Sequence, residues 1–203
     1  MTDVVTSTRG RAGLVAAVAA PGILVAAAGL LHPRALAPST APLWWQLHVV
    51  LLPLFPLLAV ALWVLLRGER GPLAWAARVA AYVYAAFYTA LDVLAGIAAG
   101  YLVDRAQGGS QEALDLRALG NDLGMVGSWA FLAAAVLTGV LLVRRHGRGA
   151  LPGAVVLLGG AATFLHGHVY WPTGGLAVLA IGVGCGLLAA AAAPAAAAHS
   201  SPA

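Results

Sequence analysis

Long apolar stretches separated by short polar ones dominate the pattern along this chain. Each stretch is rich in Ala, Leu and Val and lacks the two-residue alternation of a barrel strand. A bilayer core requires roughly 20 apolar residues per helical span and leaves no backbone group unpaired. The pattern therefore predicts an all-α, polytopic integral membrane protein, a six-transmembrane-helix bundle. The predicted spans are 12–32, 43–66, 74–102, 122–143, 151–169 and 174–193.

The segments around these spans complete the predicted domain organisation. Residues 1–11 are interpreted as a cytoplasmic N-terminal segment, 12–193 as one transmembrane domain, and 194–203 as a disordered cytoplasmic tail of low complexity. Between the third and fourth spans, Ser110 is suited to cap the start of a helix and Gly120 to end one. The sequence thus predicts a short extracytoplasmic surface helix at this point.

Composition and charge agree with this interpretation. Hydrophobic residues make up 62% of the chain and charged residues 9%, whereas about a quarter of a soluble domain is charged. All 11 basic residues are arginine, which excludes Schiff-base chemistry at a lysine. The formal net charge is +4, but the arginines flank the apolar stretches in short clusters. That distribution indicates membrane topology, and we expect no nucleic-acid partner.

The same arginines predict the orientation of the spans. Arginine is enriched in cytoplasmic loops. If the N-terminus is cytoplasmic, only Arg34, Arg105 and Arg117 fall on the extracytoplasmic side. We therefore expect a multi-pass protein of the cytoplasmic (inner) membrane with both termini in the cytoplasm. The arginines on the cytoplasmic side would be Arg9, Arg11, Arg67, Arg70, Arg78, Arg144, Arg145 and Arg148.

Four of the six histidines fall in one layer near the extracytoplasmic edge of the predicted bundle. A helix rises about 1.5 Å per residue, so His48 and His166 lie about 27–28 Å from the cytoplasmic edge. His32 ends the first span on the same side, and His168 lies slightly beyond His166. Residues two apart on a helix diverge by about 200°, so His166 and His168 can share one site only if the helix unwinds at Gly167.

Asp92 is the one acid well inside a predicted span. The same rise places it about 21 Å above Arg78, somewhat below the histidine layer. A charged carboxylate at that depth costs at least a few kcal/mol, so Asp92 must be protonated, paired or facing a polar cavity. Tyr84, Tyr88 and Asp92 recur every four residues and therefore share one face of the third span.

Proline supplies the space that such groups need. Pro53 and Pro56 remove two helical hydrogen bonds just below His48, so the second span should kink there and open a cavity toward the extracytoplasmic side. We expect Asp92 at its floor and histidines around its rim. The aromatic side chains predicted to line this substrate pocket are Tyr84, Tyr88, Trp129 and Trp45.

The first functional hypothesis is a bound metal ion or haem. Imidazole suits zinc, copper and iron, and a metal site needs three or four ligands from different helices. The candidate metal ligands are His32, His48, His166, His168 and Asp92. For haem b, two histidines would act as axial ligands, His48 with His166 or His32 with His166. Either cofactor would act on a membrane lipid or a small lipophilic substrate.

Two further hypotheses need no metal. In the first, Asp92 remains protonated and acts as a general acid, with Tyr88 and His48 as further catalytic residues, on an isoprenoid or lipid-like substrate, as in a cyclase or isomerase. In the second, Asp92 and the histidines form the proton relay of a proton-coupled transporter. A membrane-embedded enzyme, metal-dependent or acid–base, is favoured over transport because the spans carry no acid pairs.

Overall fold

The computed structural model describes residues 2–192, with side chains from Gly10 onward, and these residues contain helices and no strand. The elements are α1 (Thr2–Gly29), α2 (Ala41–Leu65), α3 (Pro72–Leu91), the π-helix η1 (Asp92–Ala98), α4 (Ala99–Ala106), α5 (Gln111–His146), the 3₁₀-helix η2 (Gly147–Ala150), α6 (Leu151–Gly167) and α7 (Thr173–Ala192). The all-α prediction is confirmed. The predicted tail 194–203 lies outside the described residues, and residues 2–11, predicted as a separate segment, begin α1.

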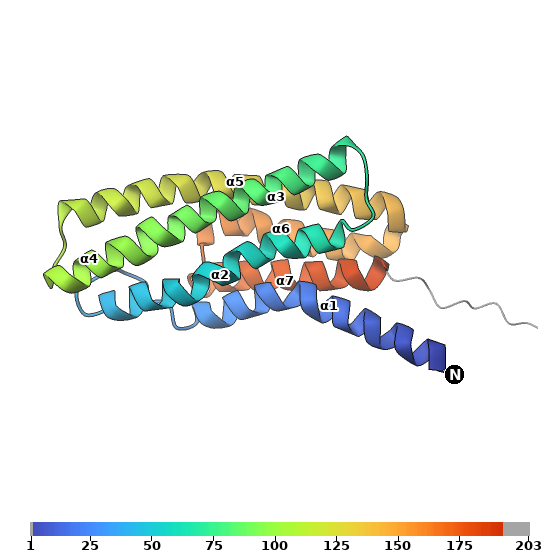
Figure 1. Cartoon of the computed structure of the whole chain (residues 1–203), viewed down its shortest axis with the longest axis horizontal. Helices are drawn as coiled ribbons and strands as arrows, with labels where there is room; N and C mark the ends of the chain where they lie inside the picture. The colour runs from blue at the N-terminus through green and yellow to red at the C-terminus, as the bar shows by residue number, and fades with distance from the viewer. Residues whose placement is uncertain (1, 193–203) are drawn as a thin grey trace, which may run out of the picture.

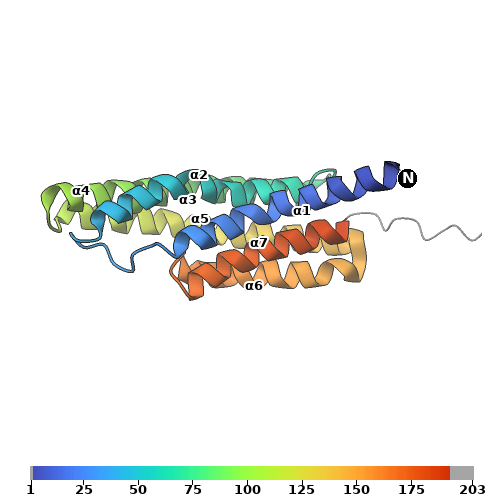
Figure 2. The ribbon, with the colours of Figure 1, turned by 90° about the horizontal axis from the view of Figure 1, so that it is seen from below.

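The helices run side by side along the long axis of the molecule (Figures 1 and 2). Each packs on the next, α1 on α2, α2 on α3, α3 on α5, α5 on α6 and α6 on α7, and α7 packs back on α1 to close the ring. We call the end with loops 30–40, 107–110 and 168–172 the histidine end. We call the end with loop 66–71 and η2 the arginine end; the described chain also begins and ends there (Figure 1).

Five segments are long and apolar enough to cross a membrane, which indicates a membrane protein. They are Gly10–Gly29, Ala41–Leu65, Pro72–Ala106, Gln111–Gly167 and Thr173–Ala192. The fourth contains α5, η2 and α6, which reverse direction at η2 (Figure 1). Four of the five segments match a predicted span to within four residues at each end, because apolar length decides both, whereas Gln111–Gly167 covers the predicted spans 122–143 and 151–169 together.

Small residues bring the helices close enough to form this ring. Gly22 of α1 faces Gly182 of α7, where a Cβ added to Gly22 would lie 2.5 Å from the Gly182 nitrogen. Such backbone contact is typical of helices that associate in membranes, where apolar side chains gain little by leaving lipid. Gly22 and Gly182 therefore serve helix packing.

One predicted element does not form. Ser110 caps α5 as expected, and its hydroxyl accepts a hydrogen bond from the Ala113 N–H at 3.2 Å. The helix does not stop at Gly120, however, and continues to His146, so the separate surface helix is replaced by the first turns of α5. Gly120 packs against the π-helix, where a Cβ would lie 2.7 Å from the Ala95 nitrogen. This glycine permits a close approach and does not terminate a helix.

Candidate metal centre

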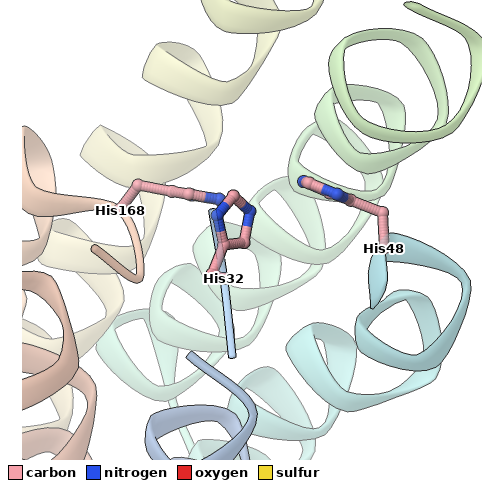
Figure 3. Close-up of side chains that lie close together, drawn as sticks. All are labelled: His32, His48 and His168. Carbon is pink, nitrogen blue, oxygen red and sulfur yellow. The ribbon is translucent and has the colours of Figure 1, made fainter. Parts of the chain in front are cut away.

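Three histidines from distant parts of the chain meet at the histidine end (Figure 3). His32 lies in the loop after α1, His48 in the second turn of α2, and His168 directly after α6. One nitrogen from each ring lies within 4.8 Å of the other two. The ring centroid of His32 is 5.0 Å from that of His48 and 5.8 Å from that of His168, and the three rings point toward one another.

His32 is held by the turn that ends α1. Its backbone N–H donates to the Gly29 carbonyl at 3.1 Å, and its ring Nδ1 lies 2.7 Å from the Pro33 carbonyl oxygen. A carbonyl can only accept, so Nδ1 carries the proton and Nε2 carries the lone pair. Nε2 is buried and has no hydrogen-bond partner in the described chain. Burial lowers the pKa of His32, which keeps the ring neutral and able to bind a metal.

His48 is held in the same way by its own helix. Its Nδ1 lies 2.8 Å from the carbonyl oxygen of Trp44, one turn earlier in α2, and the side chain is 2% exposed. Space for the ring comes from Gly96 in the π-helix, because a Cβ at that position would collide with the imidazole. The π-helix therefore allows the backbone to approach His48 closely, and π-turns occur frequently at functional sites.

His168 is placed by an unusual backbone conformation. Its φ is 42°, in the left-handed region that non-glycine residues avoid at a cost of about 1–3 kcal/mol. The turn directs the ring inward, where Nδ1 shares a hydrogen bond with the hydroxyl of Tyr88 from α3. Burial, together with the neighbouring His48 and His32, holds the pKa of His168 well below its usual value. His168 is therefore neutral as well.

The three environments have one feature in common: every Nδ1 is engaged in a hydrogen bond. The carbonyl partners of His32 and His48 can only accept, so Nε2 carries the lone pair in both rings; at His168 it does so in the tautomer in which Nδ1 donates to the Tyr88 hydroxyl. Metal-binding histidines almost always use the second ring nitrogen in this way, since the hydrogen bond fixes the tautomer and the ring orientation. Bonds of about 2.1 Å to a tetrahedral zinc separate the ligand atoms by about 3.4 Å. The ring nitrogens that lie within 4.8 Å of one another must therefore approach further to bind one ion.

A cavity of about 170 Å³ adjoins two of the three histidines. Its walls come from α2, α3, the π-helix, α5 and the end of α6, so it lies inside the ring of helices at the histidine end. The lining residues are Trp44, His48, Tyr88, Leu91, Ala95, Arg117, Asn121, Met125, Ser128, Phe164, Leu165, His166, His168 and Tyr170. A fourth ligand, such as water or a substrate atom, could reach a bound ion from this cavity.

Two of the five predicted ligands do not join the group of three. His166 is exposed at the end of α6 and lines the cavity without approaching the other histidines. Asp92 begins the π-helix, is completely buried, and has no hydrogen-bond partner for either carboxyl oxygen among the described residues. It does not line the cavity.

The predicted aromatic wall forms in part. Of the four predicted residues only Tyr88 lines the cavity; Tyr84 is buried outside it, and its hydroxyl donates to the Phe55 carbonyl at 3.3 Å. Trp129 is 57% exposed on the outer face of α5 and contributes nothing to the cavity. Trp45 also lies outside the cavity. Its indole N–H donates to Asp104 of α4 at 3.1 Å, which holds the ring against that helix.

The cavity residues that sequence reasoning missed include Trp44, Arg117 and Tyr170. Trp44 is buried, and its indole N–H donates to the Ala95 carbonyl at 3.2 Å. It precedes His48 by four residues, so helical spacing could have placed both on one face. Tyr170 and Arg117 come from regions predicted as a loop and a surface helix, and no periodic pattern marks them.

Comparison with protein-family models, with curated proteins and with solved structures finds no match for this chain.

Proposed function

We propose that this protein is a six-span membrane protein that binds one transition-metal ion through His32, His48 and His168, and that it acts on a lipophilic substrate delivered from the membrane. One observation carries the proposal. Three imidazoles converge, and each is oriented by a hydrogen bond at Nδ1, as in metal-binding histidines. The sixth span comes from dividing the segment Gln111–Gly167 at η2 into α5 and α6.

Zinc fits this ligand set best among zinc, copper and iron. Catalytic zinc sites combine three protein ligands with a fourth position open to water or substrate, and the cavity beside His48 and His168 provides such a position. Zinc lowers the pKa of a bound water to about 7 and polarises carbonyl or phosphoryl oxygens. The proposed activity is therefore metal-assisted hydrolysis or a related acyl or phosphoryl transfer.

Haem is less compatible with the arrangement. A haem with two axial histidines needs their rings on opposite faces of the macrocycle. Here the His32 ring lies 5.0 Å from His48 and 5.8 Å from His168, in the space between them that a macrocycle would have to fill (Figure 3). His166, the predicted partner in both haem pairs, is exposed.

Metal-free acid catalysis by Asp92 has less support than metal binding. The carboxyl group is completely buried and unpartnered, as expected for a protonated acid, but it does not face the cavity that would admit a substrate.

The orientation of the protein in the membrane follows from the distribution of its arginines. We infer that the arginine end lies in the cytoplasm and that the histidine end lies on the extracytoplasmic side of the inner membrane.

The direct test is the metal content of the full chain purified in detergent. We expect about one zinc per chain and a loss of at least 100-fold in zinc affinity for His48→Ala or His32→Ala, because removal of a second-shell partner alone costs about 10–100-fold. His146→Ala, at the far end of α5, is the matched control and should retain the ion. Metal-free wild-type protein that does not take up zinc, copper or iron would overturn the proposal.

A further inference from the structure

We infer that the cavity beside the three histidines binds the head group of an anionic amphiphile that enters between α5 and α6, with Arg117 as the residue that anchors the negative charge. The inference deepens the proposed function, since it names the substrate class of the same site. Only the reaction of the bound substrate would require the metal. The binding step itself rests on Arg117, on the position of the cavity mouth and on the size of the cavity.

Arg117 carries a positive charge, and none of the acids whose side chains the structure describes forms an ion pair with it. The side chain is half-buried, lines the cavity and lies over the Trp44 ring, with its Cζ 5.4 Å from the ring centroid. Among the side chains that the structure describes, the only ion pair joins Arg145 to Glu69 at the opposite end of the bundle. A guanidinium group pairs best with carboxylate and phosphate, which match its planar fork of donors. The unpaired guanidinium group in its wall therefore makes the cavity suited to bind an anion.

Exposure of the lining residues locates the mouth of the cavity. Asn121 and Met125 of α5 and His166 of α6 are exposed, whereas Tyr88 and Phe164 are no more than 2% exposed. The opening therefore lies between α5 and α6, on the side of the bundle. Both helices belong to a segment apolar enough to cross a membrane. A molecule can enter from the lipid without first leaving the membrane.

The size of the cavity determines which part of that molecule can enter. A cavity of 150 Å³ is known to hold a benzene molecule, and the cavity here measures about 170 Å³. It can hold a head group but not a hydrocarbon chain, which must remain in the lipid outside the mouth. Trp44 connects the anchor to the metal centre, because its ring lies 4.8 Å from His32 and 5.4 Å from His48. A head group held by Arg117 therefore lies beside the proposed ion.

Binding of single-chain amphiphiles to the detergent-purified full chain tests this inference. The probes are lysophosphatidic acid, oleate and uncharged monoolein. We expect each anionic probe to bind about tenfold more tightly than monoolein, and Arg117→Gln to remove that preference, because the guanidinium group supplies charge-assisted hydrogen bonds to the anion. Arg117→Lys should retain part of it. The matched control Arg105→Gln, an exposed arginine at the same end, should change nothing.

The outcomes separate the head-group site from the metal site. Tighter binding of lysophosphatidic acid identifies phosphate as the preferred group, and tighter binding of oleate identifies carboxylate. Equal affinities for all three probes, or an unchanged preference in Arg117→Gln, would overturn the inference. If Arg117→Gln does not fold, Met125→Trp, which narrows the mouth, should weaken both anionic probes, and unchanged binding there would also overturn it. Anion preference in a chain that takes up no metal would contradict the proposed function alone.

Discussion

The two ends of the bundle use polar side chains in opposite ways. At the arginine end, the guanidinium group of Arg78 donates to the carbonyls of Leu66 and Glu69 at 2.7 and 3.1 Å. Arg145 of α5 pairs with the Glu69 carboxylate in the loop between α2 and α3. These groups satisfy one another and fasten the loop to its neighbours, so the cluster has a structural role.

At the histidine end the polar groups have bonding capacity left over, and that capacity faces inward. The buried Nε2 of His32 has no partner, and Arg117 has no acid beside it in the described chain. A buried polar atom without a partner costs about 1–3 kcal/mol. The difference between the two ends teaches that unused bonding capacity beside a cavity, more than the number of polar residues, distinguishes a binding site from a structural cluster.

Filling the space beside His48 should affect the histidine end most strongly. In Gly96→Ala the new Cβ collides with the imidazole, so His48 must move and zinc occupancy should fall below about a tenth of the wild-type value. Gly159→Ala is the matched control, because nothing lies within 4 Å of a Cβ there and alanine favours the helix by about 0.5–1 kcal/mol. Metal analysis of both proteins gives the result. Full occupancy in Gly96→Ala would show that His48 is not a ligand.

Removing the hydrogen bond that orients His168 should have the next largest effect. Tyr88→Phe deletes the hydroxyl beside Nδ1 and keeps the aromatic ring in place. We expect zinc affinity to fall about 10–100-fold, as for other second-shell partners, with little change in the thermal unfolding midpoint. A competition titration against a chelator of known affinity measures the change. Tyr82→Phe, on the exposed face of the same helix, should bind zinc as the wild type does, and equal affinities for the two variants would contradict the assignment.

Acidification should destabilise the metal-free protein through the histidine end. Burial lowers the pKa of His32 and of His168, so both rings stay neutral in the folded chain at pH values where the unfolded chain takes up protons, below about 6.5. The unfolded state then binds more protons, and the free energy of unfolding decreases as the pH falls from about 7 to 5. Thermal unfolding at both pH values, compared with His168→Gln, should show a smaller decrease in the variant. A decrease in His168→Gln as large as that in the wild type would mean that the His168 ring is already charged in the fold.

The smallest effect is expected at the arginine end. Glu69→Gln removes the charge that pairs with Arg145, whose side chain is 51% exposed. Exposed ion pairs contribute about 0–1 kcal/mol, so the unfolding midpoint should shift by a few degrees at most and zinc content should not change. Loss of zinc in this variant would show that the two ends are not independent.

The position of the site along the bundle could be predicted from the sequence, but its exact ligands could not. Counting residues along helices placed His32, His48 and His168 in one layer, because the rise per residue is nearly constant. The choice between His166 and His168 depends on the residue at which α6 ends, and helix ends are poorly determined by sequence. The helix ends at Gly167, so His166 keeps its exposed helical position while His168 turns inward.

The aromatic residues illustrate a second limit. Apolar length and arginine distribution locate the spans but do not show which face of a helix points inward. The depth of Trp45 and Trp129 in the membrane could therefore be predicted from the sequence, but not whether their side chains face the cavity. The hydrogen bonds of Trp44 to Ala95 and of Trp45 to Asp104 depend on the π-helix. The residues of Asp92–Ala98 would equally form an α-helix, so their helix propensities do not predict the π-helix.

The π-helix also bears on how this chain tolerates changes in length. A π-turn holds one residue more than an α-helical turn, so deleting one residue between 93 and 98 would let an α-helix form there and leave the residues beyond it on their present faces. Gly100 would still face Trp44 and Trp45, and Asp104 would still accept from Trp45. A deletion in α3 before the π-helix would instead rotate everything beyond it by about 100°. The π-helix is thus a point at which this chain can lose a residue and keep the fit of α4 against α2.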